Sequence, residues 1–250
     1  MQRVLVLGGG GSLGRVLCSS LQSSGYIPIS VDLIASPTAR ASYIISPHLS
    51  PTSVASALRV ALRVASAPPL AAILVTAGAW EGGNASNPSF LESYERLNHA
   101  CLTPALVGTV LAASSEGLLA PGGLFLLTGA AAVLDAKTPP TGMLAYALVK
   151  NATHALTRGV GHEGGGLSQG TCALALAPHT IDTPANRESM PNGDFDRWTK
   201  PEILASKIIS WIDKPKTRPN SGTIVEVKSM RVTLSWDKND FRIIEQYFNH

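Results

Sequence analysis

Short apolar runs alternate with longer segments of amphipathic helical spacing along the whole chain. The runs are nearly continuous rather than alternating, which is typical of strands that are buried on both faces. They predict strands at residues 4–7, 27–31, 73–76, 124–128, 172–177 and 224–227. Between them, the spacing of apolar residues predicts helices at residues 13–23, 52–65, 89–112, 144–158 and 201–212.

This alternation predicts the fold class. A chain that alternates strand and helix throughout forms a parallel sheet, because each crossover returns through a helix. We therefore expect an α/β fold, a Rossmann-type doubly wound parallel sheet with helices on both faces, in a single domain. We assign residues 1–229 to this domain and residues 230–250 to a C-terminal extension. Residues 231–236 have a weak strand-like pattern, and we interpret the extension as a surface segment or a dimer arm.

The composition excludes several classes of protein. The chain of 250 residues has 45% hydrophobic and 15% charged residues, which is typical of a folded globular domain rather than a disordered chain. Its formal net charge is only +3 and it has no basic run, so we expect no nucleic-acid partner. Cys18, Cys101 and Cys172 are odd in number and lack CxxC spacing, so they predict neither a disulfide framework nor a metal site.

The mean hydropathy is positive, +0.17, which raises the question of a membrane protein. The most apolar region, residues 105–134, is interrupted by residues 114–117 and again by residues 121–123. A spanning helix needs about 20 continuous apolar residues, and a secretory signal needs about 7–15. The chain shows neither pattern. We therefore expect no membrane partner and a cytoplasmic location in which the thiols stay reduced.

The first predicted strand leads directly into a glycine-rich turn at residues 8–14. Within it, Gly9, Gly11 and Gly14 match the spacing GxGxxG. This spacing brings a bare backbone and the start of a helix close to a pyrophosphate. A lone GxGxxG is a weak signal, but this one follows a strand and opens an amphipathic helix. The predicted cofactor-binding residues of this turn are Gly8, Gly9, Gly11, Ser12, Leu13 and Gly14.

Asp32 closes the second predicted strand, 18 residues beyond Gly14. A carboxylate there can accept hydrogen bonds from the adenosine ribose hydroxyls, and it repels the 2′-phosphate of NADP. Arg15 favours the opposite choice, because a guanidinium beside the ribose can bind that phosphate. We favour NADH as the cofactor and keep NADPH as a possibility.

Tyr146 and Lys150 lie four residues apart, on one face of a predicted helix. A phenol is a poor proton donor at neutral pH unless its anion is stabilised. The ammonium of Lys150 one turn away provides such stabilisation and can also hold the nicotinamide ribose. We therefore expect both residues to be catalytic and to contact the cofactor.

Taken together, these features resemble the short-chain dehydrogenase/reductase family over nearly the whole chain. Thr76-Ala77-Gly78 is similar to the segment with which this family shapes the adenine side of its cofactor site. Residues 178–183 resemble its Pro-Gly-x-x-x-Thr segment, although His179 replaces the glycine. The resemblance implies that Ala77, Gly78 and Thr183 bind the cofactor, and it loosely places Asn98 in a proton relay.

The usual catalytic serine of this family is missing. Its position about 13 residues before the tyrosine is Val133, and residues 129–134 contain no hydroxyl. We call these residues the hydroxyl-free segment. Either the protein is inactive or its substrate needs no carbonyl-polarising donor there. Thr138 and Thr141 are alternative hydroxyl donors in the following loop.

The dihydropteridine reductase branch of the family also lacks this serine, and the chain resembles it closely. The matching strings are residues 78–85, which include Trp80, residues 129–135, and residues 182–191, which include Asn186. The resemblance implies a hydride transfer from NADH to a quinonoid dihydropterin, with Tyr146 and Lys150 as the proton-donor pair. It also implies that Trp80 and Asn186 contact the pterin, although Trp80 could instead pack in the core. The chain departs from that branch in a longer loop before Tyr146 and in a longer C-terminal tail.

Two other functions stay open: an NADPH-dependent carbonyl or pteridine-type reductase of the same fold, and a non-catalytic nucleotide sensor. The predicted helices at residues 89–112 and 144–158 carry small apolar residues on more than one face. In the resembling family these helices pair with those of a second copy, so we expect a homodimer. We interpret His99, His154 and His179 as structural rather than metal-binding, because no second ligand lies at useful spacing.

Overall fold

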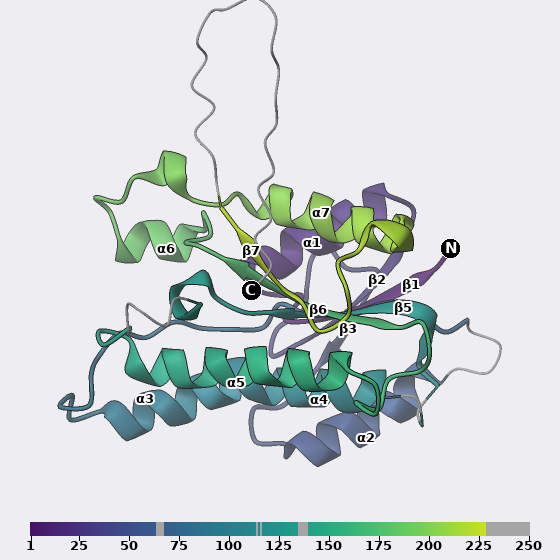
Figure 1. Ribbon diagram of the computed structural model, residues 1–250, viewed down its shortest axis with the longest axis horizontal. Coiled ribbons are helices and arrows are strands. Elements are labelled where there is room, and N and C mark those ends of the chain that lie inside the picture. Colours follow the sequence, from purple (N-terminus) through teal and green to yellow (C-terminus); the bar gives the residue numbers. More distant parts are fainter. Residues whose placement is uncertain (64–67, 114, 116, 135–139, 229–250) are drawn as a thin grey trace, which may run out of the picture.

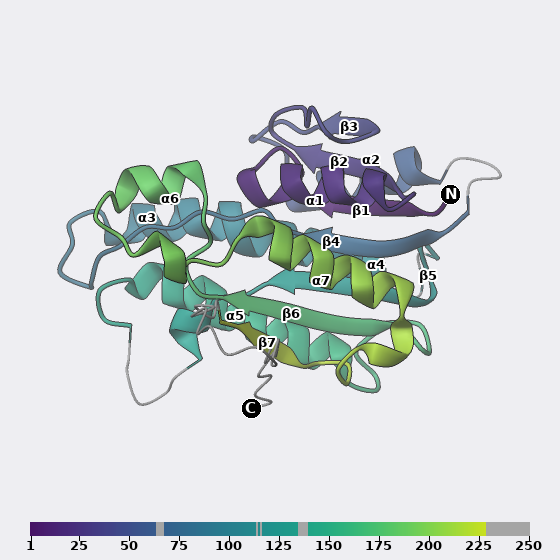
Figure 2. The same ribbon diagram turned by 90° about the horizontal axis from the view of Figure 1, so that it is seen from above.

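The computed structural model describes residues 1–63, 68–113, 115, 117–134 and 140–228. Its middle layer is a seven-stranded sheet in the order β3-β2-β1-β4-β5-β6-β7, and all neighbouring strands pair in parallel (Figure 2). The strands are β1 (Arg3–Leu7), β2 (Ile27–Asp32), β3 (Ala41–Ile44), β4 (Leu70–Val75), β5 (Leu119–Thr128), β6 (Cys172–Pro178) and β7 (Ile224–Val227). The order reverses between β1 and β4, and ligands of such sheets bind at the carboxyl ends of the strands on either side of a reversal.

Helices cover both faces of the sheet, as the alternation of elements predicts. They are α1 (Ser12–Ser23), α2 (Pro51–Leu62), α3 (Phe90–Leu97), α4 (Thr103–Ala112), α5 (Leu144–Gly161), α6 (Pro184–Ser189) and α7 (Pro201–Asp213). Figure 1 shows α1 and α7 on one face and α2 to α5 on the other. Alternate β1 side chains enter the two cores: Val4 and Val6 join α1 and α7, while Leu5 and Leu7 join the opposite core.

The six predicted strands and the doubly wound class are confirmed, but the sequence pattern missed two short elements. β3 is a four-residue edge strand whose side chains are mostly exposed, so it has no continuous apolar run. α6 has six residues, none of them buried, and therefore no amphipathic stripe. Both lack the burial that makes an element visible as a hydrophobic pattern.

The single helix predicted at residues 89–112 is wrong in one respect. The structure has α3 and α4 joined by a π-helical turn, Asn98–Leu102, in which the Thr103 N–H bonds to the Asn98 carbonyl. Pro104 follows immediately and has no N–H to offer the Ala100 carbonyl. The regular i→i+4 ladder therefore cannot continue, and the wider turn takes its place.

The strand predicted at residues 124–128 begins earlier, at Leu119, and runs through Pro121, Gly122 and Gly123. These residues were expected to interrupt the apolar region and to precede the strand. Gly122 takes φ +74°, and the register with β4 shifts between Leu70 and Ala72. Arg218 stabilises this irregular part of the strand, because its Nη1 donates to the carbonyls of Gly122 at 2.7 Å and Gly123 at 3.2 Å.

Two further expectations concern the ends of elements. The helix predicted at residues 52–65 ends at Leu62, and residues 64–67 lie outside the described part of the chain. The strand-like piece at residues 231–236 and the boundary at 229/230 also lie outside it. In the part that the structure describes, no helix combines the length and apolar character that crossing a membrane requires.

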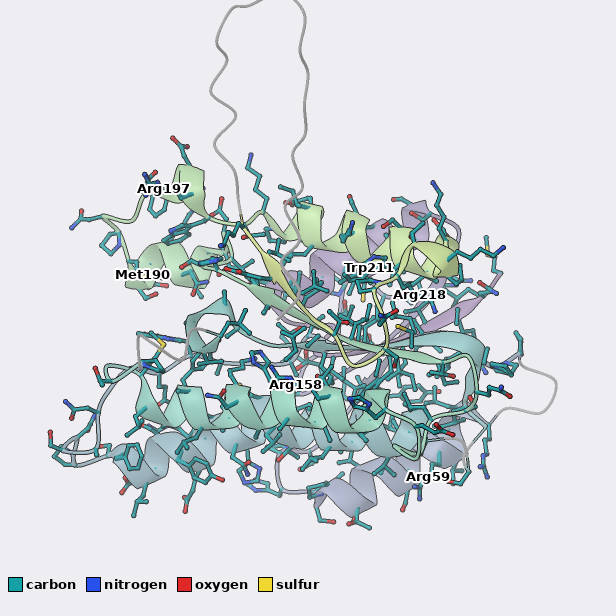
Figure 3. The ribbon with its side chains drawn as sticks, viewed as in Figure 1. Arg59, Arg158, Met190, Arg197, Trp211 and Arg218 are labelled. Atoms are coloured by element: carbon teal, nitrogen blue, oxygen red, sulfur yellow. The ribbon has the colours of Figure 1, made fainter. Side chains whose placement is uncertain are left out.

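Arg218 gives a direct test of this packing. Besides the two glycine carbonyls, its Nε donates to the Trp211 carbonyl at 2.6 Å (Figure 3). That carbonyl has no helical donor because Pro215 stands four residues later. We expect Arg218→Met to lower the free energy of unfolding by about 2–3 kcal/mol, because three carbonyls lose a charged donor.

Urea denaturation followed by circular dichroism measures this change. The matched control is Arg197→Met. Arg197 is exposed and pairs with Asp194 at 3.1 Å, and we expect its loss to cost less than about 1 kcal/mol. Equal effects of the two substitutions would contradict the role given to Arg218.

Candidate active site

The turn between β1 and α1 requires glycine at two positions. Gly8 has φ +97°, and a Cβ there would lie 2.2 Å from the Ala77 nitrogen. A Cβ on Gly14 would lie 2.0 Å from the Gly8 carbonyl oxygen. The turn therefore packs directly against the segment after β4 and against α1, and neither contact leaves room for a side chain.

The N-terminus of α1 opens onto this turn without a side-chain cap. Its N-cap residue is Gly11, and its first turn contains no acidic residue. Gly11 and Ser12 are exposed, whereas Leu13 is buried beneath them. The first N–H groups of a helix have no intrahelical acceptor and, with the helix dipole, attract an anion. This bare, uncapped turn therefore fits the pyrophosphate of a dinucleotide.

Asp32 ends β2 beside the glycine turn. Its Oδ2 accepts a hydrogen bond from the Gly10 N–H at 2.8 Å, and its Oδ1 accepts one from the Leu33 N–H at 2.7 Å. Each carboxylate oxygen has a further lone pair, so Asp32 is fixed in place and can still accept from a hydroxyl. Gly10 is one of the variable positions of the GxGxxG motif, and its N–H joins the turn to the Asp32 carboxylate. Arg15 lies nearby, and its Nε donates to the Gly10 carbonyl at 2.6 Å.

Tyr146 and Lys150 lie one turn apart on α5, as their spacing predicts. Lys150 is buried, and its Nζ donates to the Thr128 carbonyl oxygen at the end of β5 at 2.8 Å. The same Nζ lies 5.7 Å from the centre of the Tyr146 ring. A Cβ on Gly78 would lie 3.8 Å from it. Ala77 and Gly78 therefore connect the glycine turn to the lysine.

Burial controls the protonation of this pair. It raises the pKa of the Tyr146 phenol and lowers the pKa of the Lys150 ammonium. The sequence led us to expect that Lys150 lowers the phenol's pKa, and in the protein alone it does not. The ammonium is directed at Thr128, and loss of hydration, with a smaller effect from Cys101, raises the phenol's pKa. The phenol is therefore protonated at neutral pH.

The loop after β4 carries Trp80, which is 52% exposed, so packing in the core does not describe it. Two contacts restrain this loop. The Ala79 N–H donates to Cys101 Sγ at 3.4 Å, and the Glu81 carboxylate accepts two hydrogen bonds from Arg96 of α3, each of 2.8 Å. The bonds from Arg96 lower the pKa of Glu81 to about 2. Trp80 is thus presented to solvent on a tethered loop.

The same loop also holds the start of α5. The Gly83 N–H donates to the Gly142 carbonyl at 2.7 Å, and the Leu144 N–H donates to the Gly83 carbonyl at 2.9 Å. Gly83 has φ +125°, which favours glycine. The position of Tyr146 is therefore tied to the loop that carries Trp80.

The hydroxyl-free segment lies against the tyrosine. Ala130, Val133 and Ala147 form a small apolar cluster, and the Tyr146 ring packs on it. The side chain at the position of the missing serine, Val133, is buried in this cluster. Of the alternative hydroxyls, Thr141 is exposed on the turn before α5, and Thr138 lies outside the described residues.

Thr183 and Asn186 lie at the start of α6, after β6. The Thr183 hydroxyl is buried and accepts the Asn186 N–H at 3.2 Å, so it caps the helix while its own proton stays available. Asn186 Nδ2 donates to the Ile181 carbonyl at 2.8 Å. His179, which replaces the family's glycine, bonds through Nε2 to Glu226 of β7 at 2.8 Å. These bonds hold Thr183 and Asn186 within the segment after β6, and they hold His179 to β7.

Several residues near the site were not found from the sequence. Thr128 accepts from Lys150 through its backbone carbonyl, which no residue pattern reveals. Cys101 of the π-helical turn and Arg96 of α3 bond to the Trp80 loop, and these contacts depend on how the chain folds. His154, interpreted as structural, follows Lys150 by one helical turn, and its Nε2 accepts the Ala130 N–H at 3.2 Å. Within the described residues, no group of three His, Cys, Asp or Glu side chains is arranged to hold a metal ion.

Glycine substitutions test the geometry of the turn without a ligand. We expect Gly14→Ala to lower the free energy of unfolding by about 1–3 kcal/mol, because its Cβ would overlap the Gly8 carbonyl. Gly11→Ala is the matched control, since its Cβ would meet only that carbonyl at 3.4 Å, and we expect a loss of less than about 1 kcal/mol. Chemical denaturation provides both values, and a larger loss in Gly11→Ala would contradict this geometry.

The sequence and the fold were compared with those of known proteins. The chain is 32% identical over 237 residues to a dihydropteridine reductase from Dictyostelium discoideum, covering 94% of this chain and 98% of that protein. No family model matches the chain.

Solved structures show the same fold. A mutant short-chain dehydrogenase/reductase from Serratia marcescens superposes with a TM-score of 0.74 at 18% identity, covering 91% of this chain and 96% of that one. BdcA, solved in complex with NADPH, superposes with a TM-score of 0.69 at 20% identity, covering 91% and 93%. At the level of sequence, the match to the Dictyostelium protein is much stronger and nearly end to end. The chain therefore belongs to the dihydropteridine reductase family, an oxidoreductase family of the short-chain dehydrogenase/reductase type.

Proposed function

We propose that this chain uses NADH to reduce a quinonoid dihydropteridine, such as dihydrobiopterin, to the tetrahydropteridine and so regenerates tetrahydrobiopterin. Its relative from Dictyostelium carries the name dihydropteridine reductase. We place the activity in the cytoplasm, which agrees with three buried cysteines that form no disulfide.

One observation carries the proposal: a protonated tyrosine stands beside a buried lysine and against a segment that offers no side-chain hydroxyl. Reduction of a ketone builds charge on an oxygen, and a polarising donor lowers that barrier. A quinonoid dihydropterin is a planar, electron-poor ring whose reduction builds no such alkoxide. The apolar Val133 therefore suits a pterin better than a ketone.

The binding roles follow the geometry. The uncapped turn formed by Gly8, Gly9, Gly11, Ser12, Leu13 and Gly14 would hold the pyrophosphate, and Asp32 would hold the adenosine ribose. Ala77 and Gly78 lie between the glycine turn and Lys150, where they would line the cofactor site. The Thr183 hydroxyl could donate its proton to the carboxamide of the nicotinamide. When bound, the nicotinamide supplies the hydride.

The proton comes from the protein. A phenol is protonated at neutral pH, and burial, which raises the pKa of Tyr146, keeps it so. Lys150 has its ammonium fixed by Thr128, so it can stabilise the phenolate that remains after proton transfer and contact the nicotinamide ribose. Trp80, exposed on its tethered loop, offers an aromatic face for the pterin to stack on, and Asn186 offers an amide oxygen.

The first test is oxidation of NADH in the presence of freshly generated quinonoid dihydropterin. We expect wild-type turnover, and we expect Tyr146→Phe to lower kcat by about 100-fold or more because the proton donor is lost. Lys150→Ala should lower kcat by a similar factor. Tight NADH binding without turnover in the wild type would favour the nucleotide sensor instead.

We also propose that NADH is preferred to NADPH. Asp32 is held by two backbone N–H groups beside the turn, where its charge would face a 2′-phosphate. The guanidinium of Arg15 is bonded through Nε to the Gly10 carbonyl, which restrains it as a phosphate partner.

The ratio of kcat/KM for NADH to that for NADPH tests this preference. We expect Asp32→Asn to reduce the ratio by about tenfold or more, because the charge repulsion disappears. Arg15→Gln is the control and should leave the ratio within about twofold. A wild-type preference for NADPH would contradict the proposal.

Finally, we propose a homodimer through α4 and α5. These helices lie on the same face of the sheet (Figure 1), and among their side chains Leu106, Val110 and Leu148 are exposed. Leu91 and Tyr94 extend the exposed apolar surface onto α3. Several exposed apolar side chains on the helices of one face are typical of an isologous interface.

Light scattering tests the dimer. We expect twice the chain mass at micromolar concentration, and we expect the double variant Leu106→Glu/Leu148→Glu to be monomeric because buried carboxylates would face each other. Ile203→Glu, an exposed apolar residue of α7 on the opposite face, should stay dimeric. A monomeric wild type would overturn the proposal.

A further inference from the structure

α5 presents a third functional side chain in line with the tyrosine and the lysine. Tyr146, Lys150 and His154 recur at intervals of four residues, so they lie on one helix face. Lys150 Nζ donates to the Thr128 carbonyl, and two residues later the Ala130 N–H donates to His154 Nε2 at 3.2 Å. Two successive helical turns therefore hold the backbone that leaves β5 for the hydroxyl-free segment.

The bond to His154 satisfies a donor that has no place in the sheet. Ala130 is 4% exposed and extended, with φ −155° and ψ 133°, between the end of β5 and a short 3-10 turn, Ala131–Val133. A buried N–H without an acceptor costs about 1–3 kcal/mol. His154 meets this need as a neutral ring, because burial, with smaller effects from Arg158 and Lys150, lowers its pKa to about 4. Its Nε2 accepts, so its proton is on Nδ1.

Gly129 and His154 form a matched pair. A Cβ on Gly129 would lie 2.3 Å from His154 Nε2 and 3.4 Å from the Leu176 carbonyl oxygen. Gly129 is not among the glycines with positive φ, so its backbone conformation would accept a side chain. The imidazole ring is therefore what excludes one.

The segment that His154 holds is the one on which Tyr146 packs. Ala130 and Val133 contact the Tyr146 ring together with Ala147. Tyr146 is half-buried and also packs on a second cluster that includes Leu97 and Cys101. The segment is therefore one of two surfaces that hold the ring, and a shift of it would move the phenol. Small displacements of a reacting group are costly, because an error of about 1 Å can reduce a rate by up to about 100-fold.

We propose that His154 is a positioning residue: by accepting the Ala130 N–H, it fixes the hydroxyl-free segment against the Tyr146 ring and so sets the place of the phenol. The part of this inference that concerns turnover rests on the proposed pterin reduction. The part that concerns the backbone contact does not.

The test compares His154→Leu, which removes the acceptor, with His154→Gln, whose side-chain oxygen can restore it. Thr157→Val is the matched control, because Thr157 is buried one turn further along α5 and its hydroxyl donates to the Thr153 carbonyl of the same helix at 2.9 Å. For each variant we would measure amide hydrogen exchange at Ala130, the NADH dissociation constant, and kcat and KM for quinonoid dihydropterin.

We expect His154→Leu to speed exchange at Ala130 by about tenfold or more. In the same variant kcat should fall by about 10- to 100-fold, while the NADH dissociation constant changes by less than about threefold. His154→Gln should recover both exchange protection and most of kcat. Thr157→Val should lower stability without changing either value.

A double-mutant cycle gives an independent check if His154→Leu folds poorly. Gly129→Ala should lower kcat in the wild-type background, where its Cβ would strike the imidazole. It should lower kcat much less in the His154→Ala background, because the ring is gone. Additive effects of the two substitutions would overturn the proposal.

Unchanged exchange at Ala130 in His154→Leu would also overturn it, as would an equal fall of kcat in Thr157→Val. If the wild type does not reduce the pterin, but Ala130 protection is lost in His154→Leu and regained in His154→Gln, the backbone contact is supported. In that case only the proposed function has failed.

Discussion

A buried ammonium bonded to the last carbonyl of a central strand organises this molecule. Lys150 reaches Thr128 across 2.8 Å, and this contact joins α5 to β5 at the carboxyl edge of the sheet. An unpaired charge at that depth would be costly, so the helix and the strand must stay in this register. Tyr146 and His154, one turn away on either side, are placed by the same constraint. The Trp80 loop then bonds to the start of α5 through Gly83.

Much of this architecture was predictable, because buried strands and the glycine turn leave strong patterns. The six strands, Asp32 at the end of β2 and the spacing of Tyr146 and Lys150 all follow from residue types along the chain. The break in the helix at residues 89–112 was not predicted, although Pro104 was a visible cause. β5 continues through Gly122 and Gly123 because Arg218 donates to their carbonyls. Arg218 lies 96 and 95 residues further along the chain, and no local pattern indicates so distant a partner.

The site itself was predicted by residue type rather than by geometry. The sequence showed that Val133 stands at the position of the missing serine but could not show what surrounds it. In the structure that place is an apolar cluster of Ala130, Val133 and Ala147 under the Tyr146 ring. Nor could the sequence give the sign of the shift in the phenol's pKa, since burial, a property of the folded chain, is its main cause.

We propose that a tyrosine–lysine pair without a neighbouring hydroxyl selects a pterin over a ketone. The most direct measurement is the ratio of kcat/KM for quinonoid dihydropterin to that for a simple aromatic ketone, with saturating NADH and one enzyme preparation. We expect a ratio of about 100 or more, because the site offers a ketone no polarising donor. Equal or faster reduction of the ketone would contradict it.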